Sequence, residues 1–559
     1  MSAAKSVPFD IGQAMNEARA RLHPGELRDA EKILTRVLKA APDYYDALNM
    51  LGAVKAQLGR FGEAQRLLAA AVRINPGVPA AFANLGQVLH ALKRDQEALE
   101  CFDKALALEP QDVAVLNHRG NTLLGLGRPQ EALAAFQQVL ARAPHHIEAA
   151  LNSGVAQAKL GHPDEAIAAF DRALALAPAN PAAHYNRGVA LFNLGRHADA
   201  IAAHDRALAR VPDHAGAWLN RGQALAALNR LDEALASYAK ANELRKDHPD
   251  TLFNEALALL TSGDYRRGFA RYEARWRRSG MPAPRSRGRP LWLGEYPPSR
   301  KTMLIHAEQG LGDSIQFARY VPLLARQGAK VVLEVQPELV TIMARLEGAA
   351  AVIARGAAPP PFDLHCPLGS LPLAFHTELA SIPAQVPYLA ADDPHLAKWS
   401  ERMGKLARPR IAIAWSGHAA HVNDRNRSIA FAALQPLFGA HSTASFVGIQ
   451  REVRGSDAGA LAAARRVTPV GDALEDFADT AAVIALADLV ITVDTAVAHL
   501  VGAMAKPVWV LLPFQPDWRW SLGGETTPWY PTARLFRQPA IGDWASVVAR
   551  VGIELARFR

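Results

Sequence analysis

The sequence of 559 residues carries a formal net charge of +8 at pH 7; half of its residues are hydrophobic and 21% are charged. This composition excludes an intrinsically disordered chain and allows three or more compact domains. The charge permits anionic ligands without requiring nucleic acid as a partner. The two cysteines, Cys101 and Cys366, match no metal or disulfide spacing. Because no run of about 18 apolar residues and no signal-peptide pattern occurs, we expect a cytoplasmic protein.

A 34-residue period organises the chain from about residue 11 to residue 282. Glycine recurs at positions 52, 86, 120, 154, 188 and 222, alanine at 64, 98, 132, 166, 200 and 234, and proline at 76, 110, 144, 178 and 212. This pattern is typical of the tetratricopeptide repeat, a pair of antiparallel helices that stacks on its neighbours. The small residues allow close helix approach, and the proline ends the second helix. We therefore predict an all-α superhelix of about eight repeats, atypical at both ends.

Asparagine recurs two residues before the repeat glycine, or before the alanine that replaces it in the last repeat. The positions are Asn84, Asn152, Asn186, Asn220 and Asn254. They fall on the first helix of each repeat, which should line the concave face of the array, and an amide both donates and accepts hydrogen bonds. One interpretation is a ladder that binds the backbone of an acceptor peptide. The alternative is that asparagine is simply frequent at this position of the repeat.

Arginine is concentrated between residues 265 and 300. Phe269, Tyr272 and Trp276 recur there at helical spacing, which favours a capping helix with a solvated basic face over a nucleic-acid or membrane surface. The Pro- and Arg-rich residues that follow predict an irregular linker over 283–300. The rest of the sequence divides into two α/β lobes, 301–400 and 408–559.

The first lobe opens with a short apolar strand and a glycine turn. Gly310 and Gly312 allow close approach of the backbone to a ligand, and a helix carrying Asp313 follows. The turn is neither a Walker motif nor a complete dinucleotide fingerprint. Asp313 is either a functional carboxylate or a helix N-cap. His306 and Glu308 are second choices for a general base, and His365 and His376 belong to a later, loop-rich stretch.

The second lobe opens with a buried strand that ends in the turn Ser416–Gly417, and a polar loop follows. Arg425 and Arg427 in this loop are candidates for binding phosphate, because guanidinium groups bind phosphate oxygens in pairs. The alternative is a mobile surface loop. Gln450 ends the next strand and is a candidate contact to a nucleotide. We expect the final helix, about 543–558, to pack across both lobes.

A strand–helix–strand unit over 489–513 carries the densest group of candidate residues. Ligands of open α/β sheets bind outside the carboxyl ends of the strands, and the N-terminus of a helix favours phosphate. Asp494, Thr495 and the backbone of Ala496 lie at that junction, and His499 lies one turn along the helix. They form a candidate phosphate site. The alternative is an ordinary strand–helix pair with Asp494 as the N-cap.

Three of these motifs together resemble the heptosyltransferase-type glycosyltransferases of GT-B fold: Gly310-Leu-Gly-Asp313, Ala-Trp-Ser-Gly417 and Asp494-Thr-x-x-x-His499. The resemblance implies an inverting transfer from a nucleotide-activated sugar, without a metal ion or a further cofactor. It implies that Asp313 is the base and that Thr495, Ala496 and His499 surround the donor diphosphate. The chain departs from the family at Ala496, where glycine is usual.

The complete architecture is similar to that of O-GlcNAc transferases and of bacterial repeat-containing transferases that modify flagellin. That similarity implies transfer to a Ser or Thr hydroxyl of a protein, with flagellin as one candidate, held by the repeats. Two alternatives remain. Either the acceptor is a glycan or lipid-linked sugar and the repeats recruit partners, or the lobes are catalytically idle and the chain is a scaffold. The retained Asp313, Thr495 and His499 favour an enzyme.

Overall fold

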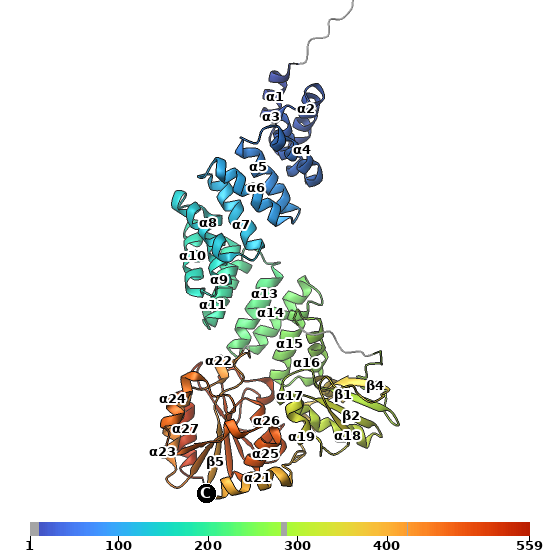
Figure 1. Ribbon diagram of the computed structural model, residues 1–559, viewed down its shortest axis with the longest axis vertical. Helices are drawn as coiled ribbons and strands as arrows, with labels where there is room; N and C mark the ends of the chain where they lie inside the picture. The colour runs from blue at the N-terminus through green and yellow to red at the C-terminus, as the bar shows by residue number, and fades with distance from the viewer. Residues whose placement is uncertain (1–9, 281–287, 422, 559) are drawn as a thin grey trace, which may run out of the picture. The chain divides into compact units, whose positions relative to one another are not determined.

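The computed structural model describes residues 10–280, 288–421 and 423–558. The chain forms two compact units, Met1–Asn220 and Arg221–Arg559. The described part of the first unit is helical, whereas the second contains the end of the helical array and two parallel β-sheets (Figure 1). Within the described residues, no helix is both long enough and apolar enough to cross a bilayer.

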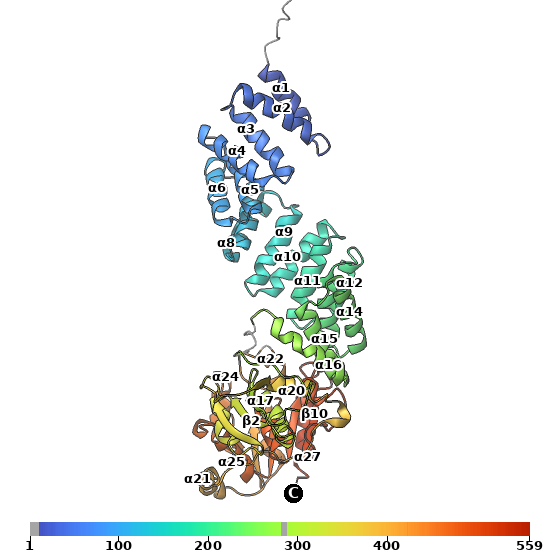
Figure 2. The same cartoon turned by 90° about the vertical axis from the view of Figure 1, so that its right-hand side faces the viewer.

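Successive helix pairs make up the first unit (Figure 2). From α1 to α12, consecutive helices pack against each other, as α4 does with α3 and α5. The second helix of a repeat ends just before the periodic proline, so the sequence period sets the helix boundaries. The bounds are α1 (Ile11–Ala20), α2 (Leu27–Ala40), α3 (Tyr45–Gln57), α4 (Phe61–Ile74), α5 (Pro79–Ala91), α6 (Asp95–Leu108), α7 (Val113–Gly125), α8 (Pro129–Arg142), α9 (Ile147–Lys159), α10 (Pro163–Leu176), α11 (Pro181–Asn193), α12 (His197–Leu208) and α13 (Ala215–Ala227), which ends in the second unit.

The repeat glycines mark the points where the two helices of a repeat touch. A Cβ atom added to Gly120 or Gly154 would lie 2.5 Å from a ring carbon of an aromatic residue on the second helix. The rings belong to Phe136 and Phe170, which are fully buried. Glycine at this position therefore lets the ring fill the space between the helices, as the sequence period predicts.

The second unit begins with the last helices of the array. These are α14 (Leu231–Leu244), α15 (Pro249–Ser262) and α16 (Tyr265–Tyr272), followed by the 3₁₀ turn η1 (Glu273–Arg277). Helix α16 buries Tyr265, Phe269 and Tyr272. Arg266 and Arg267 on α16 are exposed, as the expected solvated basic face requires, whereas Arg275 in η1 is buried with 1% of its side chain exposed and pairs with two glutamates. Arg285 and Arg287 lie outside the described residues.

The predicted linker is described only from residue 288 onwards. Leu291 forms a parallel bridge with His365 on the first sheet, and the Trp292 N–H donates to the His365 carbonyl at 2.9 Å. The Trp292 side chain is buried. This part of the segment is therefore packed along a sheet edge.

Four parallel strands form the first sheet in the order β3–β2–β1–β4. Their bounds are β1 (Thr302–His306), β2 (Lys330–Val335), β3 (Ala349–Ala354) and β4 (Leu364–Pro367), and the helices between them are α17 (Leu311–Phe317), α18 (Val321–Arg326), α19 (Val340–Met343) and, after β4, α20 (Leu371–Ala374). His365, which we expected in a loop, lies on β4. Its ring contacts the His306 ring on β1, with 3.2 Å between nitrogens. His376 lies in a turn after α20.

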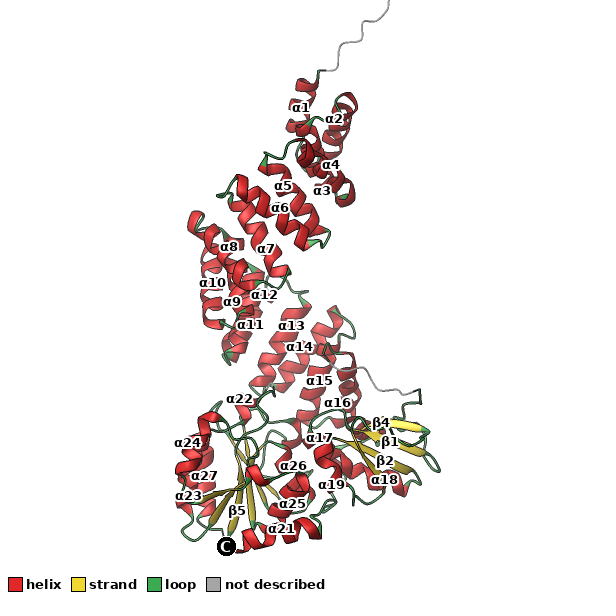
Figure 3. Cartoon of the chain, in the orientation of Figure 1, coloured by secondary structure: helices red, strands yellow, loops and turns green. Residues whose placement is uncertain are grey.

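Six parallel strands form the second sheet in the order β10–β9–β8–β5–β6–β7 (Figure 3). The strands are β5 (Arg410–Ala414), β6 (Ser445–Gly448), β7 (Val467–Pro469), β8 (Leu489–Val493), β9 (Val508–Leu512) and β10 (Ala533–Arg537); the helices are α21 (Asp393–Gly404), α22 (Asp424–Arg427), α23 (Gln435–Ala440), α24 (Gly455–Ala463), α25 (Phe477–Leu486), α26 (Ala496–Ala503) and α27 (Trp544–Leu555). The strand order reverses between β5 and β8. Ligands of doubly wound sheets bind outside the carboxyl ends of the strands at such a reversal.

Two hydrophobic cores hold the second unit together. The larger contains residues of α15, α16, the first sheet and one face of the second sheet. The smaller covers the opposite face of the second sheet and includes Val547, Val551 and Leu555 of α27. The expectation that the final helix crosses both lobes was therefore wrong: its apolar face packs on α23 and β10. Helix α21, which begins within the predicted bounds of the first lobe, packs on α25 of the second lobe.

The glycine contacts of the array predict opposite effects for two substitutions. Gly154→Ala should lower the free energy of unfolding by about 1–3 kcal/mol, because the methyl group would overlap the Phe170 ring. A Cβ atom at Gly62, on α4, would have no neighbour within 4 Å. Gly62→Ala should therefore raise the free energy of unfolding by up to about 1 kcal/mol through helix propensity. Urea unfolding followed by circular dichroism measures both. Equal effects of the two substitutions would contradict the packing argument.

Candidate functional site

The turn between β8 and α26 is capped by Thr495. Its hydroxyl accepts from the Val497 N–H at 3.3 Å, and its backbone is extended. The alternative in which Asp494 caps the helix is therefore wrong. Asp494 is buried, and burial followed by the nearby Asp517 carboxylate raises its pKa to about 6. A carboxyl with this pKa gains or loses its proton near neutral pH when a neighbouring charge changes.

His499 is buried on α26 between aromatic rings. Its Nδ1 lies 3.0 Å from the Tyr530 hydroxyl, and its ring stacks on Trp520 at a centroid distance of 5.4 Å. Burial, and then the positive charge of Arg519, hold the pKa of His499 well below its usual range. At neutral pH the ring is uncharged and acts through hydrogen bonding rather than as a cation.

Gly312 brings the first lobe against this histidine. A Cβ atom at position 312 would lie 2.8 Å from Cδ2 of His499 and 3.5 Å from Cα of Ala496. The glycine, predicted to approach a ligand, thus permits close contact between α17 and α26. Gly310 is the N-cap of α17, and its N–H donates to Oδ2 of Asp313 at 3.0 Å.

The turn after β5 is held by Gln450. Its amide oxygen accepts from the N–H groups of Trp415 and Ser416, both at 3.1 Å. Gln450, a candidate nucleotide contact, thus has its carbonyl oxygen bonded within the turn. Gly417 donates to the Ser428 hydroxyl at 3.0 Å. The buried Oγ of Ser416 has no hydrogen-bond partner among the described residues.

The two candidate arginines differ in their placement. Nη1 of Arg427 donates to the Asp494 carbonyl at 3.1 Å, and its guanidinium lies over Gly417, where a Cβ atom would approach Nη2 to 2.6 Å. Arg427 therefore joins the carboxyl ends of β5 and β8. Arg425, on the same short helix, is exposed. The structure brings Arg427, but not Arg425, into contact with the other candidates.

Asp313 is held at both carboxylate oxygens. Oδ2 accepts from Gly310, and Oδ1 accepts from Nη2 of Arg519, which belongs to the second lobe. Asp313 is not the N-cap, but it reaches back from the first turn of α17 to bond the N-cap backbone. The side chain is 25% exposed. The structure thus places the candidate base at the junction of the two lobes.

Arg519 is a site residue that the sequence analysis missed. It lies in the 3₁₀ turn η8 (Trp518–Trp520) after β9 and is 7% exposed. Its guanidinium also bonds Gln316 and Asp517, the latter at 2.9 Å. A signal was present, since an arginine between two tryptophans follows the carboxyl end of a buried strand. Arginine in such a position is more often a ligand or interface residue than a solvated charge.

Glu308 is a second buried carboxyl near Asp313. Its Oε1 accepts from the Gly369 N–H at 3.0 Å and from Arg275 at 3.1 Å, whereas Oε2 is buried without a partner among the described residues. Burial raises the pKa of Glu308 to about 7, although Arg275 opposes the rise. His306, the other second choice for a base, is buried within the sheet, where its ring contacts His365.

The repeat asparagines are half-buried and bond mainly to neighbouring repeats. Asn84 donates to the Asn49 side chain at 2.9 Å and Asn152 to the Asn121 side chain at 2.7 Å. The corresponding bond of Asn220 goes to the Tyr185 hydroxyl, and Asn254 bonds the Asp250 carbonyl in its own helix. One amide N–H of each of these four is therefore used within the array. Asn186 occupies the equivalent position on α11.

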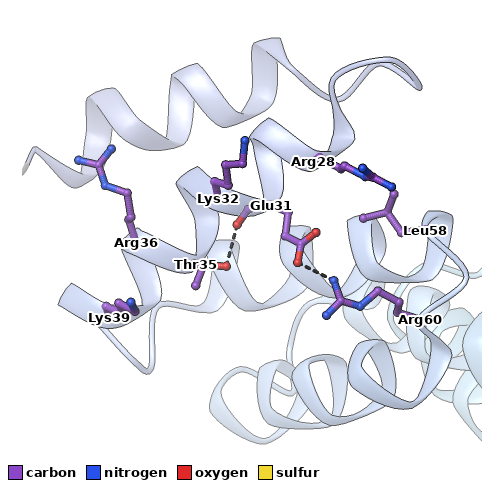
Figure 4. Close-up of a pocket in the computed structure, with 8 residues that line it drawn as sticks. All are labelled: Arg28, Glu31, Lys32, Thr35, Arg36, Lys39, Leu58 and Arg60. Carbon is purple, nitrogen blue, oxygen red and sulfur yellow. Dashed lines mark hydrogen bonds and ion pairs between the residues drawn. The ribbon is translucent and has the colours of Figure 1, made fainter.

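A surface pocket of about 650 Å³ lies in the first repeats, in the compact unit that lacks the sheets (Figure 4). Arginine and lysine dominate its wall, and Glu31 accepts from Arg60 at 2.8 Å. The lining residues are Arg28, Glu31, Lys32, Thr35, Arg36, Lys39, Leu58 and Arg60. No motif of the sequence predicted this pocket. Among the described residues, no group of three His, Cys, Asp or Glu side chains is placed to hold a metal ion.

Models of the tetratricopeptide repeat match residues 21–73, 77–143, 118–181, 151–208 and 185–249. The N-terminal region, α1–α16, is therefore an all-helical tetratricopeptide-repeat array, as predicted, and a region of parallel sheets and helices follows it. Such arrays commonly bind protein partners on their extended surfaces.

Protein FlbA of Caulobacter vibrioides is 26% identical to the chain over 330 residues, which cover 54% of each protein. The match thus spans about half the length of this curated relative. Among solved structures, a tetratricopeptide repeat protein from Parabacteroides merdae is 19% identical with a TM-score of 0.37, covering 44% of this chain and 98% of its own. YrrB, a repeat protein with an unusual peptide-binding site, is 24% identical with a TM-score of 0.30 and covers 34% and 98%.

The raised pKa of Glu308 predicts a pH dependence of stability. Its folded pKa of about 7 exceeds the ordinary value of 4.5, so the stabilisation is complete below pH 4.5 and is lost as pH rises through 7. A glutamine side chain at this position resembles the protonated carboxyl at every pH. The free energy of unfolding of Glu308→Gln relative to wild type should therefore rise by about 1–3 kcal/mol between pH 5 and pH 8.

Unfolding by urea at a series of pH values measures this difference. The exposed Glu347 supplies a matched control, because Glu347→Gln removes the same charge from the surface and should show a difference that does not change with pH. A constant difference for Glu308→Gln as well would show that the buried carboxyl does not titrate in this range.

Proposed function

We propose that the chain is an inverting, metal-independent glycosyltransferase with a GT-B module, which transfers a sugar from a nucleotide-activated donor to a Ser or Thr hydroxyl of a protein. One observation carries the proposal. The candidate residues of two separate sheets meet at one junction, where Gly312 contacts His499 and Asp313 pairs with Arg519. Asp313 follows β1 and Arg519 follows β9, so both lie beyond the carboxyl ends of parallel strands, where ligands of such sheets bind.

The donor phosphates are assigned to the second lobe. The N-terminus of α26 presents backbone N–H groups, which favour an anion. Arg427 adds a positive charge beside Asp494 and Gly417, and the buried hydroxyl of Ser416 adds a donor. His499 is neutral and contributes a hydrogen bond rather than charge. Together these groups stabilise the negative charge that grows on the leaving nucleotide.

Asp313 is assigned as the base. In the proposed reaction the acceptor hydroxyl oxygen bonds to the anomeric carbon while its proton passes to a carboxylate oxygen of Asp313. The bond from the anomeric carbon to the donor phosphate oxygen breaks, and the nucleotide leaves with the electron pair from the opposite face of the sugar. The configuration at the anomeric carbon is thereby inverted.

The array is assigned to recruitment of the acceptor protein. The repeats offer protein-binding surface, and the half-buried amides of Asn84, Asn152, Asn186, Asn220 and Asn254 carry both donors and an acceptor, as pairing with a peptide backbone requires. Flagellin is a candidate acceptor through the resemblance alone. A glycan or lipid-linked acceptor, with the repeats recruiting partners, is the alternative within the same activity.

One observation favours a different class of function, a protein-interaction scaffold with idle lobes. Both oxygens of the Asp313 carboxylate already accept hydrogen bonds, one of them from a buried arginine. With a donor already at each oxygen, the carboxylate is held within the junction and is not open to an acceptor hydroxyl. The enzyme proposal therefore requires that Asp313 be released during the reaction, whereas the scaffold requires no such step.

Intact-protein mass spectrometry of a matched cell lysate incubated with the purified chain tests the proposal. Wild type should add a sugar-sized mass to one protein. Asp313→Asn should reduce the rate by about 10²–10⁴-fold, because it removes the base while keeping the shape. His499→Ala should also lose transfer, and Glu347→Gln, an exposed surface change, should retain it.

The outcomes separate the candidate functions. Mass gain on a glycan or lipid fraction, with none on protein, would move the acceptor to the alternative class. Transfer by Asp313→Asn at the wild-type rate would remove Asp313 from its role. No transfer to any fraction and no binding of nucleotides would favour the scaffold.

A further inference from the structure

Arg519 occupies the centre of the lobe junction. Every nitrogen of its guanidinium has a partner: Nη2 donates to Asp313, Nε to Gln316 and Nη1 to Asp517. Two of these partners lie on α17 of the first lobe, and Asp517 lies beside Arg519 in the second. The arginine therefore connects the candidate base to the lobe that carries the candidate phosphate site.

The surroundings of Arg519 extend to the start of α26. The next residue, Trp520, stacks on His499 with ring planes 21° apart. The charge of Arg519 lowers the pKa of His499 and opposes the rise in the pKa of Asp494. Gly312 lies against the first residue of α26, with 3.5 Å between its Cβ position and Cα of Ala496, and the next residue, Asp313, pairs with Arg519. The guanidinium therefore lies near the α26 N-terminus.

Arg519 has two carboxylate partners for its single positive charge. Asp313 and Asp517 both pair with the one guanidinium, so Asp517 would still hold it if Asp313 were replaced by another anion. Phosphate oxygens match the planar guanidinium in the same two-pronged way as a carboxylate and carry more charge. A nucleotide phosphate is therefore a suitable competitor for the position that Asp313 occupies.

We propose, on the basis of the glycosyltransferase function above, that Arg519 is a donor-binding residue that exchanges the Asp313 carboxylate for a donor phosphate. The exchange positions the base. While Asp313 is paired with Arg519, its Oδ1 is occupied by a guanidinium N–H, and loss of the pair leaves this oxygen open to the proton of the acceptor hydroxyl. The donor must then bind before the acceptor hydroxyl can be deprotonated. The activated acceptor therefore does not form in the absence of donor.

Binding of nucleotides to variants of the full chain tests this exchange without reference to transfer. Isothermal titration with UDP, GDP and CMP as separate probes identifies the one that binds wild type best. Arg519→Gln should weaken its binding by about tenfold or more. Asp313→Asn should tighten binding by about fivefold, because the phosphate no longer displaces a carboxylate.

A double-mutant cycle distinguishes exchange from simple charge removal. In the Arg519→Gln background, Asp313→Asn should change the affinity by less than about twofold, because no competition remains. Glu347→Gln is the control: it removes a carboxylate charge from the exposed surface of the first lobe, and it should leave the affinity unchanged. Arg519→Lys keeps the charge and supplies an intermediate case if Arg519→Gln does not fold.

The inference is overturned if Asp313→Asn weakens binding, leaves it unchanged, or tightens it by the same factor in both backgrounds. Those results leave the proposed function standing, because wild type would still bind a nucleotide. Failure of wild type to bind any of the three probes, together with no transfer to any lysate fraction, overturns the proposed function and the exchange together. Circular dichroism and thermal unfolding of each variant verify that a lost affinity does not reflect a lost fold.

Discussion

The contact between α17 and α26 is the constraint on which the junction of the two sheets depends. Gly312 has no side chain, and His499 occupies the space where a Cβ atom would be. This approach puts Asp313 within reach of Arg519 and lets the ring of Trp520 cover His499. Buried polar groups are stable only when they are paired. The junction therefore combines close packing with a set of mutually satisfied charges.

Much of the fold was predictable because its signals are local and repeated. The glycine, alanine and proline period set the array, and the strand β9 begins at Val508 and ends at Leu512, where the apolar run does. Asp494 shows the limit. A carboxylate just before a helix is a good cap, but the Thr495 hydroxyl takes that place and Asp494 is buried instead. Choice between adjacent caps depends on backbone angles that residue types do not determine.

The candidate site was predictable where a residue lies on a motif and not where it acts through distant partners. Ser416 and Thr495 follow the ends of β5 and β8, and Arg427, on α22, bonds the Asp494 carbonyl. Gln450 was a candidate ligand contact, yet its oxygen bonds the backbone of the strand beside it. Arg519 meets a partner 206 positions earlier in the chain. A pairing across that separation follows from the arrangement of two sheets, which a single sequence does not reveal.

The burial of Arg275 limits where the repeat array can be separated from the sheet-containing region. This arginine belongs to the turn that ends the repeat array, yet it bonds Glu308 and Ser370 beside the first sheet. A chain that starts at residue 301 would leave Glu308 without its cation and expose the apolar surface that α15 and α16 cover. The last pair has to be inherited together with the sheets.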